Sequence, residues 1–473
     1  MRIVLPPSET MDPPPPRRRP RWPSWRLAGP LFTIAVLLWL FLQAGVREIK
    51  PRSDRPPLPL AQFKPGPADW PGWRGPSQQG LADESADPPW RWSPTSSAGW
   101  QTVLPGGGQS SPCVWGDAVY LTAALSASKT VALLRFDRDS GRLVWHRDVG
   151  PLSGPPAEAA LPTPACDGSL IFVPVVREGY VHLVAIDAEG KLRWTCPTGP
   201  YSGRQGFHGS PVVHGSLVYL AVDEPGTRLT RWRSASTLSA VHRQTGELVW
   251  RVVRPCAESA GVPVAALLAG RRQVVFPGRR QIASYDADTG RLLWFCRWSS
   301  ARVTGSVAFD GLHVYASAGE AEAETLCVRA DGTGDVTDSH VVWRERRFTA
   351  EGAWPTLAGS SLVLLGRQGS VTALEKSTGR WLWQRRLTGE FEAPPVLVRQ
   401  RLYCTSREGI TYVVDTARRG EVLAENGLGQ AVTAALAVSG NHLIVRGARS
   451  LQLITSPPAG PYAAEPVPVP RKL

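Results

Sequence analysis

The sequence predicts an all-β protein: an eight-bladed β-propeller of four-stranded antiparallel blades, preceded by one N-terminal transmembrane helix. Three observations lead to this prediction. A short phrase ending in tryptophan returns along the chain, apolar runs typical of antiparallel strands precede each copy, and an uncharged stretch of twenty residues lies near the N-terminus. The length of 473 residues would by itself favour several domains, but a regular repeat points to one ring.

Residues 1–46 are predicted to lead from the cytoplasm into a membrane. Residues 1–26 are basic and rich in proline, and residues 27–46 are uncharged and long enough to cross a bilayer as a helix. Because basic clusters favour the cytoplasmic side, residues 1–26 are expected there. A cleaved signal peptide with a processing site near Ala44 is the alternative, and Met11 is an alternative start.

The remaining domain boundaries follow from composition. Residues 47–69 are rich in proline and are expected to form an extended spacer, residues 70–460 the propeller, and residues 461–473 a disordered or surface-bound tail. The protein is thus interpreted as a single-pass protein of the inner (cytoplasmic) membrane with an extracytoplasmic or periplasmic propeller. A lipid-modified cysteine is not expected, because no cysteine follows the apolar stretch before Cys113.

The tryptophan phrase predicts one hairpin turn for each blade. Residues 286–294 read DADTGRLLW, and variants occupy residues 137–145, 187–194, 242–250 and 375–383. The acidic residue can bond the turn backbone and the glycine can adopt a positive φ, after which the tryptophan begins the next strand. The tryptophans predicted to dock one blade on the next are Trp100, Trp145, Trp194, Trp250, Trp294, Trp343 and Trp383.

The apolar runs before each phrase predict the inner strands of the blades. Residues 111–123 read SPCVWGDAVYLTA and residues 210–222 read SPVVHGSLVYLAV, which is typical of half-buried antiparallel pairs split by a turn. The repeat spacing of about 40 to 56 residues is in the range of propeller blades. A four-stranded sheet cannot bury both faces alone, so the blades are expected to stack around an axis.

Counting the repeats gives eight blades, the last of which is incomplete. Residues 431–455 supply only three strands, and residues 420–424 keep the turn but have Ala424 at the tryptophan position. Residues 99–105 form an extra strand ahead of the first repeat. We therefore expect this N-terminal strand to complete the last blade and to close the ring.

The repeat resembles the tryptophan-docking repeat of the pyrroloquinoline-quinone (PQQ) propellers. That superfamily includes quinoprotein alcohol dehydrogenases and the propeller lipoprotein of the outer-membrane assembly machinery, both of which the chain resembles more distantly. The resemblance covers residues 70–460. Residues 69–76, DWPGWRGP, are similar to the opening motif of PQQ-like propellers abundant in planctomycete-type bacteria. Trp70 and Trp73 of this motif are expected to plug one side of the ring.

The resemblance to quinoproteins implies a cofactor site that the sequence does not match. That family holds PQQ with a pair of adjacent cysteines, a tryptophan, and Glu, Asn and Asp ligands for Ca²⁺, and a hard cation requires several converging oxygens. No two cysteines are adjacent in this chain, and no CxxCH haem signature, GxSxG, P-loop or paired-histidine motif is present. We therefore predict neither PQQ nor Ca²⁺, and no catalytic, cofactor-binding or metal-ligating residues.

Charge and cysteine content give weaker indications. Residues 1–55 hold ten Arg or Lys and four Asp or Glu, about half of the net charge of +13, so the propeller itself is only mildly basic. A nucleic-acid partner is not expected.

The seven cysteines are spread along the chain. Cys113, Cys166, Cys196 and Cys296 occupy strand positions typical of small core side chains, and no spacing indicates a disulfide.

The residues just before the first strand of each blade are expected to ring the mouth of the central channel, which either binds a ligand or is a water-filled funnel with an ordinary polar lining. They comprise residues 109–110, Thr163, residues 206–210, Thr304, residues 351–354 and Glu392. Phe207, His208, Trp354 and Glu392 have side chains able to hold a ligand or peptide. Residues 223–233 form a long insert in the third blade, and a surplus loop on a rigid scaffold is a candidate contact surface.

Two functions from different classes are compatible with this pattern. The first is a non-enzymatic, membrane-anchored scaffold that binds envelope or membrane proteins and assists their assembly. The alternative is a PQQ-dependent oxidoreductase. The fold class cannot decide between them, because one fold carries many functions. The oligomeric state has no signature in the sequence.

Replacing Trp294 by Ala is expected to lower the free energy of unfolding by about 3–5 kcal/mol, the loss typical of a large buried aromatic side chain. Urea unfolding of the wild type and the variant measures the loss. A far smaller loss would mean that this indole is not packed between blades.

Overall fold

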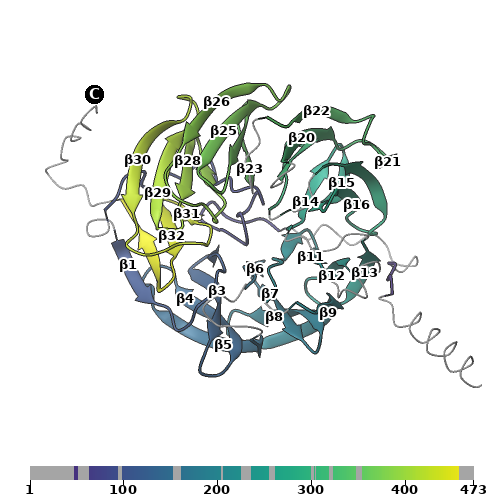
Figure 1. Cartoon of the computed structure of the whole chain (residues 1–473). Helices are drawn as coiled ribbons and strands as arrows, with labels where there is room; N and C mark the ends of the chain where they lie inside the picture. The colour runs from purple at the N-terminus through teal and green to yellow at the C-terminus, as the bar shows by residue number, and fades with distance from the viewer. Residues whose placement is uncertain are drawn as a thin grey trace, which may run out of the picture. The chain divides into compact units, whose positions relative to one another are not determined.

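Eight antiparallel sheets surround a common axis in the computed structural model of the protein, which confirms the eight-bladed propeller (Figure 1). The structure describes residues 47–51, 63–93, 98–152, 161–203, 206–224, 236–254, 261–299, 303, 305–318, 323–347 and 354–456. Strands, turns and bends make up these ranges, and none of the described residues belongs to a helix able to cross a membrane. The span expected over residues 27–46 lies outside the described residues.

Blades 1 to 4 follow one another in chain order, with the first strand of each nearest the axis (Figure 1). Blade 1 consists of β2 (Cys113–Trp115), β3 (Ala118–Leu125), β4 (Thr130–Asp137) and β5 (Leu143–Pro151). Blade 2 consists of β6 (Ala165–Cys166), β7 (Leu170–Arg177), β8 (Tyr180–Asp187) and β9 (Leu192–Pro200). Blade 3 consists of β10 (Val212–His214), β11 (Leu217–Val222), β12 (Thr237–His242) and β13 (Leu248–Val253). Blade 4 consists of β14 (Val264–Leu268), β15 (Arg271–Gly278), β16 (Gln281–Asp286) and β17 (Leu292–Arg297).

Blades 5 to 8 complete the circle. Blade 5 consists of β18 (Ala308–Phe309), β19 (His313–Ala318), β20 (Glu324–Arg329) and β22 (Val341–Glu345). Blade 6 consists of β23 (Trp354–Ala358), β24 (Ser361–Leu365), β25 (Ser370–Glu375) and β26 (Trp381–Arg386). Blade 7 consists of β27 (Val396–Val398), β28 (Arg401–Thr405), β29 (Ile410–Asp415) and β30 (Glu421–Gly427). Blade 8 consists of β31 (Ala437–Ser439), β32 (His442–Arg446), β33 (Ser450–Ile454) and β1 (Ala98–Val103).

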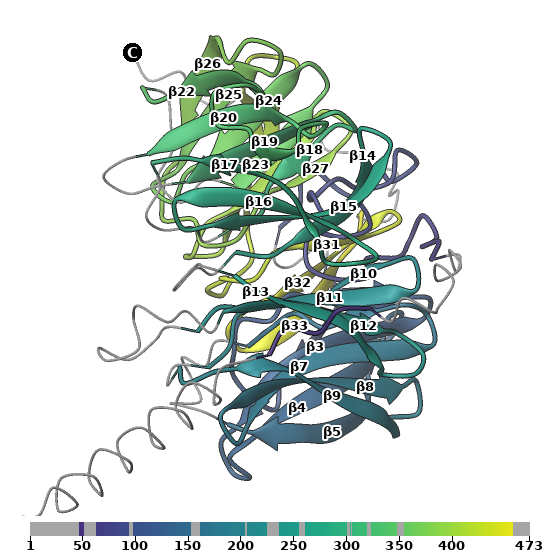
Figure 2. The same ribbon diagram turned by 90° about the vertical axis from the view of Figure 1, so that its right-hand side faces the viewer.

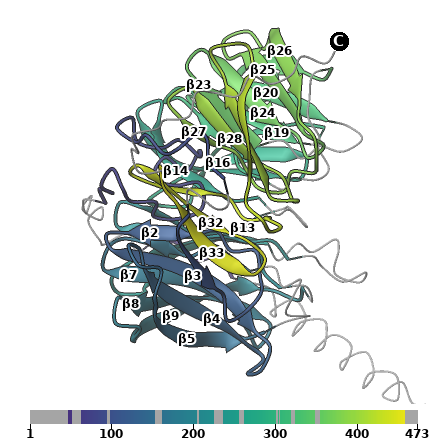
Figure 3. The same cartoon turned by 90° about the vertical axis from the view of Figure 1, so that its left-hand side faces the viewer.

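The N-terminal strand closes the ring as expected. Strand β1 pairs antiparallel with β33, where Gln101 lies opposite Gln452 and Val103 opposite Ser450. In Figure 3 the C-terminal strands β32 and β33 lie between the blades of the N-terminal third and those of the C-terminal third. One blade is therefore built from both ends of the propeller, so neither end can leave without opening the circle.

The inner strands are buried on both faces, which differs from the half-buried pairs expected from the sequence. All six residues of β11 and seven of the eight residues of β3 are buried. The outermost strand β5, by contrast, has only one buried residue among nine. Because blades stack face to face, the alternation that would mark a solvent-exposed face is lost from the inner strands and survives only at the rim.

In seven of the eight blades, a tryptophan of the fourth strand packs against the next blade. The indole N–H of Trp250 in blade 3 donates to Ala287 O in the last turn of blade 4 at 3.0 Å, and the ring lies against Gly290 of the same turn. An added Cβ at Gly290 would lie 2.7 Å from that ring. The same N–H bond joins Trp100 to Arg138 O, Trp145 to Ala188 O, Trp194 to Arg243 O and Trp343 to Lys376 O. The phrase recurs because its turn receives one indole and its tryptophan supplies the next.

The boundary after blade 4 uses a different acceptor. The indole N–H of Trp294 donates to Gln273 Oε1 of its own blade at 2.9 Å. Blade 5 offers no matching turn, because the loop before β22 instead contributes β21 (Gly334–Asp335), which pairs parallel with β17 as a fifth strand of the blade 4 sheet. Trp294 is nevertheless fully buried, so the packing of the indole is kept and only its acceptor changes.

The boundary between blades 7 and 8 receives its indole from the N-terminal segment. Ala424 occupies the tryptophan position of blade 7 and belongs to the apolar cluster that also contains the buried Trp92. The backbone N–H of Trp92 donates to Asn426 Oδ1 at 2.9 Å, and Asn426 Nδ2 donates to Trp90 O at 3.1 Å. A residue far away in sequence thus packs at the boundary where the repeat itself carries alanine.

Parts of the expected spacer are bound to the propeller. Ile49 exchanges two backbone hydrogen bonds of 2.8 Å with Arg251 on the outer edge of blade 3. The Phe63 ring lies 5.9 Å from that of Trp115, centroid to centroid. Blades 3 and 4 face the viewer in Figure 2, where β13 and β16 can be followed. The described stretches of the expected extended spacer, residues 47–69, therefore each have a backbone or aromatic partner on a blade.

Replacing Gly290 by Ala is expected to destabilise the protein more than the same change at Gly270. Both glycines have positive φ, +70° and +72°, so both variants carry the backbone strain of about 1–2 kcal/mol. Only the Gly290 variant also pushes a methyl group into the Trp250 indole, whereas nothing lies within 4 Å of the added carbon at Gly270. An excess loss of about 1–3 kcal/mol in urea unfolding is expected for G290A; equal losses would show that the glycine serves the turn and not the indole.

Candidate interaction site at the ring centre

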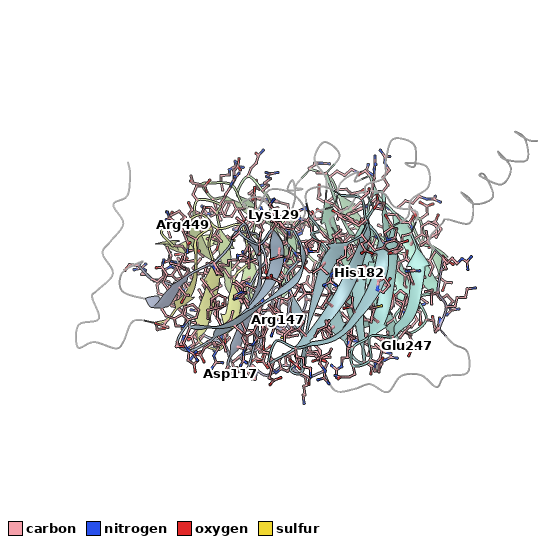
Figure 4. All side chains as sticks on the ribbon, turned by 90° about the horizontal axis from the view of Figure 1, so that it is seen from below. Asp117, Lys129, Arg147, His182, Glu247 and Arg449 are labelled. Atoms are coloured by element: carbon pink, nitrogen blue, oxygen red, sulfur yellow. The ribbon has the colours of Figure 1, made fainter. Side chains whose placement is uncertain are left out.

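The two faces of the ring are set by the antiparallel strand order. In Figure 4, Lys129 and Arg449, in turns between second and third strands, lie on one face, and Asp117 and Glu247, in first and last turns, lie on the other. The connection into each first strand therefore lies on the face of Lys129. We name these the Lys129 face and the Asp117 face.

Residues 66–82, named here the plug, enter the ring centre from the Asp117 face. Asp69 anchors the entry, since its Oδ1 accepts the backbone N–H of Gly116 in a first turn at 2.8 Å and its Oδ2 accepts that of Gly66 at 2.7 Å. Trp70 then exchanges two backbone hydrogen bonds of 2.8 Å with Val114 in β2 and is fully buried. Gly75 has a φ of +72°, and its Cα lies so close to the Trp70 ring that an added Cβ would be 2.7 Å away.

The plug is bonded to seven blades. Backbone bonds join it to blades 1, 2 and 7, and bonds that involve side chains join it to blades 4, 5, 6 and 8. Trp73 packs against the apolar cluster shared by blades 3 and 4. The hydrogen-bonded partners are Val114, Cys166, Ala265, Phe309, Pro355, Leu397 and Ser439. These residues lie in the first strands of seven blades, so one segment ties these innermost strands together.

Two glutamines of the plug imitate strand pairing. Gln78 Nε2 donates to Ala265 O at 3.1 Å while its Oε1 accepts the N–H of the same residue at 2.8 Å. Gln79 Oε1 accepts the N–H of Phe309 at 2.8 Å. First strands have a free edge toward the axis, and these amides satisfy backbone groups that would otherwise be buried without partners.

Arg74 is the buried cation at the middle of the plug. Its side chain is 1% exposed, and its Nη2 donates to Gln79 O, to Pro355 O at 2.9 Å and to Thr356 Oγ1 at 3.0 Å. Desolvation lowers the pKa of Arg74 to about 9. Among the described residues no carboxylate pairs with it, and carbonyl and hydroxyl dipoles around Nη2 offset its charge. The opening motif predicted the plug, but not that its arginine would bond to blade 6.

On the Lys129 face, hydroxyl groups link successive blades. Ser111 Oγ accepts the N–H of Ala435 from blade 8 at 3.0 Å, Thr163 Oγ1 accepts that of Ser111 at 2.9 Å, and Ser210 Oγ accepts that of Thr163 at 3.1 Å. All three hydroxyl residues precede a proline, and this recurring dipeptide is the sequence signal for the contact. Thr163 and Ser210 were expected to ring the mouth of the channel, and in the structure their hydroxyls are engaged between blades.

Arg446 closes the ring on the same face. It is 2% exposed; its Nη1 donates to Ser110 O at 3.0 Å and Thr122 O at 2.8 Å, and its Nη2 donates to Gly107 O at 3.0 Å. Burial lowers the pKa of Arg446 to about 10. A side chain of blade 8 therefore donates hydrogen bonds to three backbone carbonyls at blade 1. The sequence pattern gave no sign of this arginine.

The four predicted binding side chains have different surroundings. Phe207 is buried and stacks edge-on against Tyr201 at 5.3 Å, and Trp354 is buried at the start of β23. His208 is exposed to solvent. Glu392 is partly exposed and lies 3.5 Å from Arg367 Nη2 and 3.7 Å from Arg407 Nη1. His208 and Glu392 are therefore the two whose polar groups reach solvent.

Glu392 belongs to a small charged patch, named here the Glu392 patch. It comprises Arg367, Glu390, Glu392 and Arg407, all at turns or connections of blades 6 and 7 on the Lys129 face. The ion pairs are 3.5–3.7 Å long and mostly exposed, so they add little to stability. Their side chains remain available to a polar partner.

Several expected contact positions cannot be placed. Thr304, residues 351–353 and most of the insert, residues 225–233, lie outside the described residues. Within the described ranges, no group of three or more His, Cys, Asp or Glu side chains is arranged to hold a metal ion.

Family models and curated proteins place the chain among known propellers. A family model described as "Outer membrane protein assembly factor BamB" matches residues 92–221, 127–338 and 333–454. The chain belongs to this family. It is 23% identical over 359 residues to the outer membrane protein assembly factor BamB of Burkholderia pseudomallei (strain K96243), an alignment covering 66% of this chain and 86% of that protein.

Solved structures share the fold at lower identity. BamB from Moraxella catarrhalis superposes with a TM-score of 0.56 at 15% identity, covering 76% of this chain and all of that one. The quinohemoprotein alcohol dehydrogenase from Comamonas testosteroni superposes with a TM-score of 0.58 at 11% identity, covering 86% and 83% of the two chains. These similarities confirm the PQQ-like propeller expected from the tryptophan repeat, and at such identities they show the fold alone.

Replacing Arg74 by Lys is expected to destabilise the plug. The variant keeps the buried charge, but the shorter lysine side chain ends before the position of Nη2, the atom that donates to Gln79, Pro355 and Thr356. Buried acceptors are then left unpaired, at a loss of about 1–3 kcal/mol. Urea unfolding measures the loss, and limited proteolysis should show earlier cleavage within residues 63–93. Arg91→Lys, at an exposed arginine of the same segment, is the control; a loss no larger than in that control would contradict the role assigned to Arg74.

Proposed function

We propose that the protein is a non-enzymatic interaction scaffold of the cell envelope, which binds envelope or membrane proteins and assists their assembly. The observation that carries the proposal is the plug. Because residues 66–82 bond to the first strands of the blades and fill the ring centre from the Asp117 face, partners are left with the Lys129 face and the rim. Membership of a family described as an outer membrane protein assembly factor supports an assembly role.

The proposed contact surface is the Lys129 face. The Glu392 patch and His208 present charged and polar groups there on turns held by stacked blades. A rigid scaffold with polar turns suits recognition of another protein, because its loops are already ordered and lose little entropy on binding. The insert of blade 3, residues 223–233, is proposed as a second contact.

The proposed location is the envelope, with residues 27–46 as a single-pass anchor in the inner membrane and the propeller on its outer side. The length and apolar character of that stretch support the anchor. The curated BamB relative supports an envelope location. Cell fractionation followed by protease treatment of spheroplasts tests it: digestion of the propeller in spheroplasts supports the proposal, and full protection contradicts it.

The alternative function, PQQ-dependent oxidation, is not favoured by the residues present. The sequence has no adjacent cysteine pair to cover a quinone, and at the ring centre Arg74, Gln78 and Gln79 are already bonded to the blades. A quinone and a hard cation would need these positions or a set of converging oxygens. We therefore propose that the protein takes neither PQQ nor Ca²⁺; dye reduction after reconstitution with both would overturn this.

Photo-crosslinking in intact cells tests the scaffold role. A photoreactive amino acid at Arg407 or His208, on the Lys129 face, is expected to capture envelope proteins, because both side chains reach solvent. The matched control places it at Arg142, an exposed residue of a last turn on the Asp117 face. Equal capture from both faces, or none from the Lys129 face, would contradict the proposed contact surface.

Shortening the insert gives a second arm of this experiment. Removing residues 225–233 is expected to leave the thermal midpoint unchanged and to weaken capture, since the deletion spares the strands on either side. Unchanged capture removes the insert from the proposal while leaving the Glu392 patch to be judged by the crosslinking itself.

A further inference from the structure

We propose that Cys113 and Cys166 form a disulfide bond that joins blades 1 and 2. Their Sγ atoms lie 3.2 Å apart, and the two residues are 53 positions apart in sequence. Cys113 is in β2 and Cys166 in β6, the innermost strands of neighbouring blades. Covalent bonding needs about 2.05 Å between the sulfur atoms, so the two must approach by about one further ångström.

The plug holds the two strands in this relation. The N–H of Cys166 donates to Pro71 O at 2.9 Å, and Val114, next to Cys113, pairs with Trp70. Consecutive residues of the plug therefore bond to the two strands that carry the cysteines. The approach of the thiols follows from the geometry at the ring centre and does not depend on flexible loops.

The other cysteines of the described residues have no such partner. Cys196, Cys296, Cys327 and Cys404 are buried, but no sulfur–sulfur contact involves them. All six cysteines of the described residues belong to the apolar interior. For Cys113, Cys166, Cys196 and Cys296 this was predicted from their strand positions. The pairing escaped sequence analysis because the two cysteines occupy different positions in their repeats and meet only where adjacent blades face each other.

The surroundings determine when the bond can form. Both thiols lie in the apolar cluster between blades 1 and 2, and burial raises the pKa of Cys166 well above its usual value. A buried neutral thiol is a poor nucleophile. The bond is therefore expected to form while the two blades dock during folding, and afterwards to be shielded from reductants by the same packing.

The chemistry is thiol–disulfide exchange with an external disulfide. The thiolate of one cysteine attacks a sulfur of the oxidant and releases one of its thiols; the second cysteine then attacks the mixed disulfide and releases the other. Two protein thiols are oxidised, one external disulfide is reduced to two thiols, and the two protons pass to solvent or to the released thiolates. In cells this rests on the proposed envelope location, where oxidants of this class act.

Refolding in glutathione tests the pair independently of location. Full-length protein is reduced, unfolded, refolded with reduced and oxidised glutathione, then denatured and alkylated. Five of the seven cysteines are expected to be alkylated, and mass spectrometry of the unreduced digest should show a peptide linking Cys113 to Cys166. Alkylation of all seven, with no linked peptide, would overturn the inference.

Serine variants supply the controls. Cys113→Ser and Cys166→Ser should each lose the linked peptide and leave six alkylated cysteines, whereas Cys404→Ser, in blade 7, should keep the link and leave four. The oxidised wild type should melt several degrees above the Cys113→Ser variant, as expected for closing a loop of this length. Equal midpoints, with the link present, would contradict a stabilising role.

Protein taken from cells separates this inference from the proposed function. Cells are lysed in denaturant with the alkylating agent, so that thiols are trapped in their cellular state. If the link forms in refolded protein and is found in cells, both proposals are supported. If the link forms in refolded protein but all seven cysteines are free in cells, the proposed disulfide is supported and the proposed envelope location is contradicted.

Discussion

The structure depends on the contact between the indole of one blade and the last turn of the next. A four-stranded sheet with two apolar faces is unstable alone, and the indole joins two such sheets with one large buried surface and one directed hydrogen bond. Because the turn glycine lies against the ring, as Gly290 does against Trp250, the turn and the tryptophan constrain each other. Each blade is thus stable only with its neighbours, and the ring must close.

Two further sets of contacts stabilise the same ring: those of the plug at its centre, and those of β1 and Arg446 where its two ends meet. Contacts of the indoles run around the circumference, whereas the plug runs across it and bonds to the innermost strands. Strand β1 and Arg446 close the ring between blades 8 and 1. The N-terminal segment accordingly serves three times: as a plug, as the source of Trp92 at the boundary of blades 7 and 8, and as the last strand.

The contacts that repeat could be predicted from the sequence, and those that occur once could not. The phrase ending in tryptophan gave the blade count, and the missing strand of the last repeat gave the closure by β1. Gln273 as the acceptor for Trp294, Trp92 beside Ala424, and Cys113 beside Cys166 join residues that no periodic pattern connects. The candidate site shows the same division: the opening motif indicated a plug, while the bonds of Arg74 and the hydroxyls between blades depend on where distant strands meet.

Mutual dependence of neighbouring blades is the claim on which this account stands, and hydrogen exchange in a Trp250→Ala variant tests it most directly. The indole belongs to the interior of blade 3 and bonds to the turn of blade 4. Mass spectrometry should therefore show faster amide exchange both in β10–β13 and in β14–β17 than in the wild type. Faster exchange confined to blade 3, or no change in either blade, would contradict the account.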